Sequence, residues 1–358
     1  MPTLSSALRT LTRTQRVLIG AAVILTAGAG LTQATGAGEV TRFVVAGLAL
    51  AALAAVVSEA VNALGERVGP SITGLTQATL GNLPELFVGI FALHRGLVTV
   101  VRATLVGSVL ATVLLVLGSA FAAGGLRFGV QRFTPDEPRL TATLLLLAVA
   151  AIFVPTLASD LNTPAAAHAD ALSSLCAVLL LLVYACSVGW SLFRGRHVPA
   201  EPLEGTWSLR FSILLLAVAS VGAAAASDWF VAALEPAAAS LGMSVTFTSL
   251  VVVAIASNAV EHVVGIRFAL EGKPDLTMST TLSSPLQVAL FLTPVLVLLS
   301  NVVGPASLTL VFPPLLVAAL GVATLVVLAV VFDGEYSWVE GVALVGLYGI
   351  IAGAFWWG

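Results

Sequence analysis

Long apolar runs that carry no charge recur along this chain, and they limit its fold more than any other feature. The runs are about 20 residues long, which is the length that a helix needs to cross the hydrocarbon of a bilayer. Only 9% of the 358 residues are charged and 59% are hydrophobic, whereas a soluble domain carries roughly 25% charged residues. The sequence therefore predicts an all-α polytopic membrane protein.

Charged residues and Pro/Gly clusters divide the chain into eleven predicted transmembrane helices. The run over 241–270 is too long for one straight crossing, so we expect an interfacial segment or a break within it. The predicted spans lie near residues 17–34, 43–64, 72–94, 98–123, 139–157, 169–193, 209–233, 241–270, 277–301, 307–332 and 338–357.

The basic residues predict how these helices are oriented. With the N-terminus in the cytoplasm, twelve Lys and Arg residues fall on the cytoplasmic side and only Arg42, Arg95 and Arg102 fall outside. This is the bias expected of a correct topology, and an odd number of spans then puts the C-terminus outside. The short central loop favours a prokaryotic plasma (inner) membrane. We expect Arg95, Arg102 and Arg267 to anchor in lipid headgroups.

The chain also repeats itself. Asn82-Leu83-Pro84-Glu85 recurs as Asn258-Ala259-Val260-Glu261, and Ser108 recurs as Ser284, each 176 residues later. Each motif lies on the second helix of a five-helix block, and its serine lies on the third helix. Because five is odd, the two blocks cross the bilayer in opposite directions, which is the inverted-repeat architecture of secondary transporters.

This repeat divides the chain into four predicted segments. Residues 1–40 form a cytoplasmic N-terminus with one leading transmembrane helix, and residues 41–193 form the first five-helix repeat. Residues 194–208 form a cytoplasmic linker, and residues 209–358 form the second five-helix repeat.

The repeated motifs carry the polar groups that most need a function. A carboxylate inside a bilayer is costly and is usually functional, and both Glu85 and Glu261 fall there. Asn82 and Asn258 each lie three residues before a glutamate, on the same helix face. Two inverted motifs would form an oxygen-lined pocket with up to two negative charges, a ligand set that suits calcium. Hydrogen bonding between helices is the alternative role for the asparagines.

Neighbouring residues could add ligands or tune the site. Pro84 lacks an N–H and would free the carbonyl of Leu80. His262 could relay protons, or it could be a packed histidine with one hydrogen bond. Glu59 and Glu340 lie nearer span ends, and the sequence leaves their roles open. Hydroxyl or amide groups on the third helix of each block are offered by Ser108, Thr112, Ser284 and Gln287.

At these residues the chain resembles the calcium/cation antiporter superfamily, and specifically its cation/proton exchanger (calcium/proton antiporter) branch. The resemblance covers most of the chain from about residue 55 onward, and Pro84 is more similar to the sodium/calcium exchanger branch. It is carried by Gly65-Glu66-Arg67-Val68-Gly69-Pro70, Gly81-Asn82-Leu83-Pro84-Glu85-Leu86, Gly107-Ser108, Ser257-Asn258-Ala259-Val260-Glu261-His262, Gln287-Val288-Ala289-Leu290-Phe291 and Trp338-Val339-Glu340-Gly341.

The resemblance implies a secondary active transporter that exchanges cytosolic calcium for protons. It assigns the central acids to Glu85 and Glu261 and the motif asparagines to Asn82 and Asn258. A sodium-coupled calcium exchanger is the alternative, and a passive cation channel is a further one. We expect no enzymatic activity and no cofactor, with calcium as the transported substrate.

The remaining expectations concern partners. The net charge of −3 leaves no basic patch for nucleic acid. The expected partners are calcium, protons and the lipid bilayer, and a homo-oligomer is compatible with the sequence.

Overall fold

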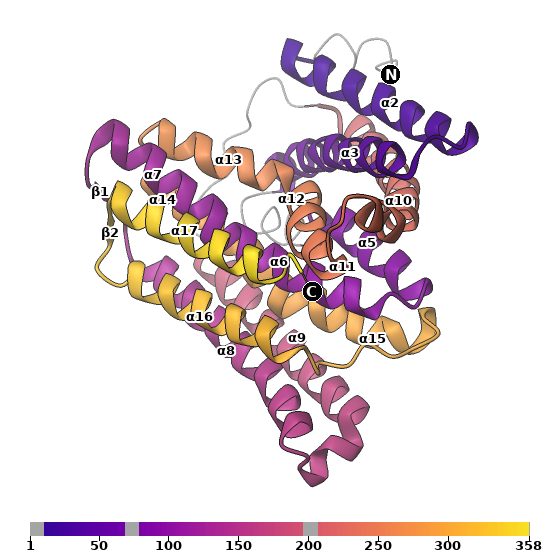
Figure 1. Cartoon of the computed structure of the whole chain (residues 1–358). Helices are drawn as coiled ribbons and strands as arrows, with labels where there is room; N and C mark the ends of the chain where they lie inside the picture. The colour runs from indigo at the N-terminus through magenta and orange to yellow at the C-terminus, as the bar shows by residue number, and fades with distance from the viewer. Residues whose placement is uncertain (1–10, 69–78, 196–206, 358) are drawn as a thin grey trace. The chain divides into compact units, whose positions relative to one another are not determined.

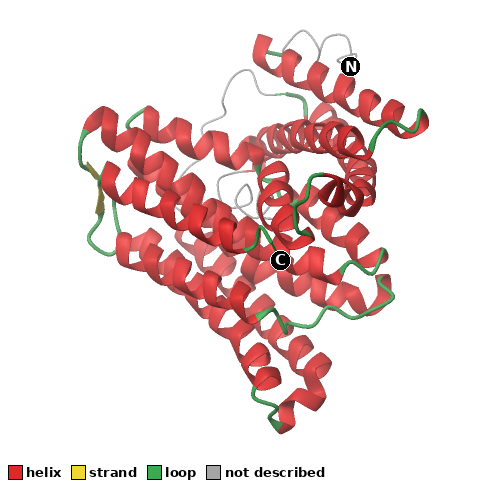
Figure 2. Cartoon of the chain, viewed as in Figure 1, coloured by secondary structure: helices red, strands yellow, loops and turns green. Residues whose placement is uncertain are grey.

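The computed structural model describes residues 11–68, 79–195 and 207–357, and these residues are helical nearly throughout (Figure 2). The strands of the described residues are β1 (Gln131–Arg132) and β2 (Glu335–Tyr336), which form one short antiparallel pair. The predicted all-α class is therefore confirmed. Most of the predicted linker over 194–208 lies outside the described residues, as does Gly69-Pro70.

Seven helices in the described part of the chain are long and apolar enough to cross a membrane, and a bent pair would make eight. Three shorter apolar helices have 10–17 residues. The count of eleven spans stays a prediction. The long helices are α2 (Arg13–Ala34), α3 (Glu39–Val68), α6-η1-α7 (Val98–Leu110, Ala111–Val116, Leu117–Phe128), α8 (Asp136–Asp160), η2-α9 (Pro164–His168, Ala169–Gly195), α10 (Leu209–Ser240) and α14-η4-α15 (Pro274–Gln287, Val288–Leu292, Thr293–Val303).

The remaining helices are the bent pair and the three short ones. The bent pair joins α11-η3-α12 (Val245–Phe247, Thr248–Val253, Ala254–Ser257) to α13 (Ala259–Leu270) at an angle of 66°. The short helices are α5 (Leu83–His94), α16 (Pro314–Val330) and α17 (Trp338–Ala354).

The chain forms two compact units, and neither is continuous in sequence. The first comprises Met1–Phe91 with Ala185–Gly242, and the second comprises Ala92–Tyr184 with Met243–Gly358. The first unit thus contains the leading helix α2 and the first helix of each predicted repeat, α3 and α10. The compact units therefore do not follow the order of the predicted repeats along the chain.

In the first unit α3 packs against both α2 and α10 (Figure 1). Thr12 starts α2 with a capping box, in which its side chain bonds the Gln15 backbone and the Gln15 side chain bonds back. Phe43 of α3 stacks on Phe230 of α10 with ring centroids 4.6 Å apart. A Cβ atom at Gly47 would lie 2.9 Å from that Phe230 ring, so the missing side chain lets the helices approach closely.

In the second unit small residues also set the helix contacts. A Cβ atom at Gly107 of α6 would lie 2.1 Å from the Leu250 carbonyl oxygen of η3. A Cβ atom at Gly341 of α17 would lie 2.3 Å from the Ala122 backbone nitrogen of α7. Backbone-to-backbone packing of this kind is typical of membrane helices, where small residues line the interfaces.

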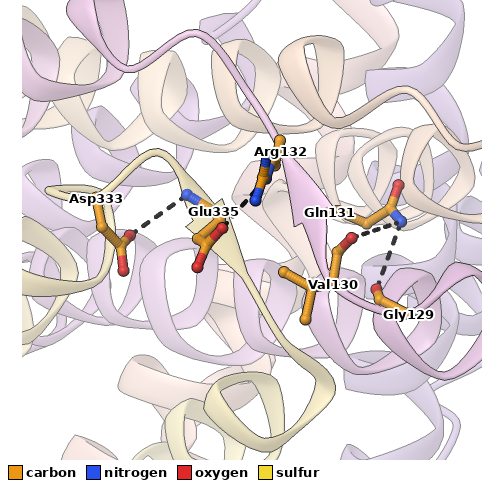
Figure 3. Close-up of polar contacts among 6 residues, drawn as sticks. All are labelled: Gly129, Val130, Gln131, Arg132, Asp333 and Glu335. Atoms are coloured by element: carbon orange, nitrogen blue, oxygen red, sulfur yellow. Dashed lines mark hydrogen bonds and ion pairs between the residues drawn. The ribbon is translucent and has the colours of Figure 1, made fainter.

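The strand pair ties together two loops at one end of the second unit (Figure 3). Arg132 of β1 pairs with Glu335 of β2, Nε to Oε2, at 3.3 Å. The Glu335 backbone N–H donates to Asp333 Oδ1 at 3.3 Å. Tyr336 stacks on Phe121 of α7 with centroids 3.9 Å apart. Burial raises the pKa of Tyr336 to about 12.

A non-helical segment over residues 304–313, in which Leu308, Leu310 and Phe312 are buried, joins α15 to α16 in the second unit. Non-helical backbone at membrane depth needs partners for its polar groups, and here hydroxyl side chains supply them. The N–H groups of Leu308, Leu310 and Phe312 donate to Ser300 of α15 (2.7 Å), Ser173 of α9 (2.8 Å) and Thr156 of α8 (3.0 Å).

Arg102 of α6 also holds this segment. Its Nη2 donates to Thr309 Oγ1 at 2.8 Å and to the Thr309 carbonyl at 3.3 Å, and its guanidinium lies 5.9 Å from the Phe312 ring centroid. The expectation that Arg102 anchors in headgroups stays a prediction, and the structure adds partners within the protein. No local pattern predicts this contact, since Thr309 lies 207 residues from Arg102 in the chain.

Candidate ion-binding site

Both repeated motifs lie where a helix is interrupted at the asparagine. Asn82 lies in a turn directly before α5, and Asn258 separates α12 from α13 with φ −108° and ψ 18°. The helices that follow begin at Leu83 and Ala259, which are 176 residues apart like the motifs. The break expected within 241–270 is therefore confirmed. The expectation that asparagine and glutamate share one helix face is corrected, because each asparagine precedes its helix.

Each glutamate consequently lies in the first turn of its helix. Glu85 is the third residue of α5 and is 4% exposed, and Glu261 is the third residue of α13 and is half-buried. The first turn carries unpaired N–H groups and the positive end of the helix dipole. This local field stabilises negative charge, so these positions suit an ionised carboxylate.

Pro84 is not required for such a break. It occupies the second position of α5, where the backbone N–H has no partner within the helix in any case. Val260 holds the equivalent position of α13, and the chain breaks there as well. A role of the Leu80 carbonyl as a ligand stays a prediction.

One hydrogen bond joins the second motif to the third helix of the first predicted block. Asn258 Nδ2 donates to Ser108 Oγ at 2.9 Å and to the Ala254 carbonyl at 3.1 Å. Asn258 is 1% and Ser108 is 2% exposed. The Asn258 carboxamide nitrogen is thus directed at α6, within one compact unit.

The other predicted ligands differ in how they are held. The Thr112 hydroxyl donates to the Ser108 carbonyl at 2.9 Å. Ser284 Oγ and His262 Nε2 are buried and have no hydrogen-bond partner among the described residues. Gln287 is half-buried at the end of α14. Ser284 and His262 are therefore the predicted groups with spare hydrogen-bonding capacity.

The structure brings together only some of the predicted site. Ser108, Asn258 and the groups on α13 and α14 belong to the second unit, whereas Asn82 and Glu85 belong to the first. A meeting of the two glutamates stays a prediction. Within the described residues no three His, Cys, Asp or Glu side chains gather where they could hold a metal.

The comparison with known protein families decides where the chain belongs. The sodium/calcium exchanger protein family matches residues 39–193 and again residues 211–357. The chain belongs to this family, in its cation/proton exchanger branch.

Individual relatives agree with this placement. A protein of Synechocystis named "Ca(2+)/H(+) antiporter" is 36% identical over 344 residues, covering 89% of this chain and 92% of that protein. The crystal structure of a Ca2+/H+ antiporter, YfkE, has a TM-score of 0.81 and 30% identity, with 95% of this chain and 99% of that chain covered. A sodium-calcium exchanger structure, NCX_Mj, has a TM-score of 0.57 and 18% identity over 93% and 99%, and shows the fold alone.

Two acids that the sequence left open have structural partners. Glu340 completes a capping box with Ser337 at the start of α17, and its Oε2 accepts from the Ser337 N–H at 2.7 Å. The Ser-x-x-Glu spacing is a known capping pattern and could have been recognised in the sequence. Glu59 accepts a hydrogen bond from Gln15 Nε2 at 3.1 Å, which no local pattern predicts.

Proposed function

We propose that this protein is a secondary active transporter that exchanges calcium, or a similar cation, for protons. The observation that carries the proposal is the repeated unit of asparagine, helix start and first-turn glutamate, at Asn82–Glu85 and Asn258–Glu261. It occurs in a chain that is 36% identical to a protein named as a Ca2+/H+ antiporter. Calcium in this proposal is cargo, and no resident cofactor is needed.

We further propose eleven spans, with one leading helix and two inverted five-helix repeats. The seven long helices, the bent pair and the three short apolar helices together offer that number. The π-helical segments η1 and η4 support the repeat, because they start three and four residues after Ser108 and Ser284. The family match in two separate stretches also supports it. The N-terminus would then be cytoplasmic and the C-terminus outside, in a prokaryotic plasma membrane.

The chemistry of exchange follows from the cost of burying charge. A carboxylate inside an apolar protein is costly when it is ionised. We therefore expect Glu85 and Glu261 to be ionised when a cation is bound and to hold a proton when none is bound. Calcium favours ionised oxygen ligands and releases protons when it binds. The protein then opens alternately to the two sides of the membrane, so the calcium-bound form carries calcium in one direction and the protonated form carries protons in the other.

Calcium uptake into proteoliposomes of the purified protein tests the proposal. Uptake driven by an imposed pH gradient alone is the expected result. Uptake that requires a sodium gradient would instead place the protein with sodium-coupled exchangers. Passive uptake down the calcium gradient, with no dependence on a pH or sodium gradient, would indicate a channel. Either of these results would overturn proton exchange.

Replacement of each motif glutamate provides the matched test. Glu85→Gln and Glu261→Gln keep the side-chain shape but cannot exchange a proton, so both variants should lose pH-driven uptake while remaining folded. Glu271→Gln is the control, because Glu271 lies outside the apolar helices and pairs with Arg267 at 2.7 Å and Lys273 at 2.7 Å. Full uptake by both motif variants would refute the assignment of these acids.

A further inference from the structure

Thr104 of α6 differs from the other buried threonines in the described part of the chain. Thr104 is 6% exposed, and its hydroxyl has no hydrogen-bond partner among the described residues. A buried hydroxyl without a partner is destabilising, and valine would fill the same space. The other buried threonines donate to a carbonyl of their own helix, as seen for Thr112, Thr156, Thr248, Thr277, Thr281, Thr293 and Thr324.

The position of Thr104 on α6 relates it to the candidate ion-binding site. It precedes Ser108 by four residues, so the two side chains lie on one helix face about 6 Å apart along the axis. Ser108 accepts the hydrogen bond from Asn258. Gly107, next to Ser108, packs directly against the backbone of Leu250 in η3. This face of α6 therefore packs against the helix that carries the Asn258 break.

The oxygens on this face of α6 are of a kind that can bind a hard cation. Hydroxyl and carbonyl oxygens are the ligands that calcium takes besides carboxylates. Ser108 and Thr104 place two hydroxyls one helical turn apart on α6, and only the Thr104 hydroxyl has no partner within the described residues. The facing segment η3 is π-helical, and π-helical turns occur frequently at functional sites.

We propose that the Thr104 hydroxyl is a ligand for the transported cation, one helical turn from Ser108, and that it helps to determine affinity for that cation. The inference rests on the proposed function. The hydroxyl is therefore retained at a cost in stability, since it stabilises the protein only when an ion is bound.

Two substitutions separate the hydroxyl from the shape of the side chain. Thr104→Val removes the hydroxyl and keeps the volume, whereas Thr104→Ser keeps the hydroxyl. Thr324→Val is the matched control, because Thr324 is fully buried in α16 of the same unit and its hydroxyl donates to the Leu320 carbonyl at 2.8 Å. The measurements are the KM and maximal rate of pH-driven calcium uptake, and the melting temperature without calcium.

Thr104→Val should raise the KM for calcium about tenfold, as expected for the loss of one oxygen ligand of a charged ion. Its melting temperature without calcium should not fall, because no hydrogen bond is lost. Thr104→Ser should keep the KM near that of the wild type, and Thr324→Val should leave the KM unchanged.

Three results would overturn the inference. One is an unchanged KM in Thr104→Val while the wild type transports, which would leave the proposed function intact. Another is an equal rise in the KM for calcium in Thr104→Ser, and the third is a fall in melting temperature that accompanies the rise in KM. Both would indicate that the substitution acts by disturbing side-chain packing. A wild type without pH-driven uptake would overturn the proposed function and this inference together.

Discussion

Single positions at the two motifs show how a polar group is made tolerable in an apolar protein. Asn258 satisfies its carboxamide nitrogen with a hydroxyl and a carbonyl. Glu85 and Glu261 stand in the first turns of their helices, where the helix dipole offsets part of the cost of a negative charge. The motif spacing thus places the acid at the N-terminal end of a helix, where its negative charge is stabilised.

Pro84 offers a test at the same scale. Since the break at Asn258 forms without proline, Pro84→Ala should leave the helix start at Leu83 in place. The free energy of unfolding should change by less than about 1 kcal/mol, because the restored N–H is one of the unpaired groups of the first turn. The melting temperature should therefore change little. Thermal unfolding and pH-driven uptake measure both properties. Loss of uptake in a stably folded Pro84→Ala variant would show instead that proline, through the Leu80 carbonyl, belongs to the ion path.

Among the elements, the non-helical segment over 304–313 takes two of its hydrogen-bond partners from helices far away in sequence. Hydroxyls from three helices satisfy alternate backbone N–H groups of this segment. Side chains on both sides of these bonds are almost fully buried, as Leu310 (0%) and Ser173 (1%) illustrate. Water cannot replace a lost partner at such depth, so each hydroxyl is a specific support for the fold.

Thr156→Val should therefore destabilise the protein. Thr156 accepts from the Phe312 N–H and donates to the Leu310 carbonyl at 3.1 Å, and the substitution leaves a buried N–H without a partner. The expected loss is about 1–3 kcal/mol, seen as a lower melting temperature in detergent. Thr324→Val changes the same chemistry at a site with only an intrahelical bond and should cost less. Equal melting temperatures for the two variants would contradict this role of Thr156.

For the whole molecule, the central question is which loops face which side of the membrane. With Cys176 and Cys186 replaced by serine, a single cysteine at Ala165 should react from outside with a membrane-impermeant maleimide. A single cysteine at Asp333 should react only after the cells are opened. Both positions are exposed, Ala165 within the short helix η2 and Asp333 in the turn before β2, so a failure to react reflects sidedness. Labelling of Asp333→Cys in intact cells would refute the predicted orientation.

The sequence by itself determined the membrane class, the irregularity of the run over 241–270 and the positions of the repeated acids. These follow from local properties, because the length of an apolar run and a fixed spacing of 176 residues can be read without knowing any contact. Family membership likewise rests on motifs that lie in order along the chain.

Tertiary structure alone decided which polar groups support the fold and which keep an unused hydrogen-bonding group. Ser108 meets Asn258 across 150 residues, and Arg102 holds Thr309 across 207. No local pattern encodes such pairs, since a hydroxyl or guanidinium in an apolar helix can bond its own backbone, a neighbouring helix or an ion equally well. Only the packing of the helices selects among these partners. Among the buried threonines of the described residues, it leaves only the Thr104 hydroxyl without one.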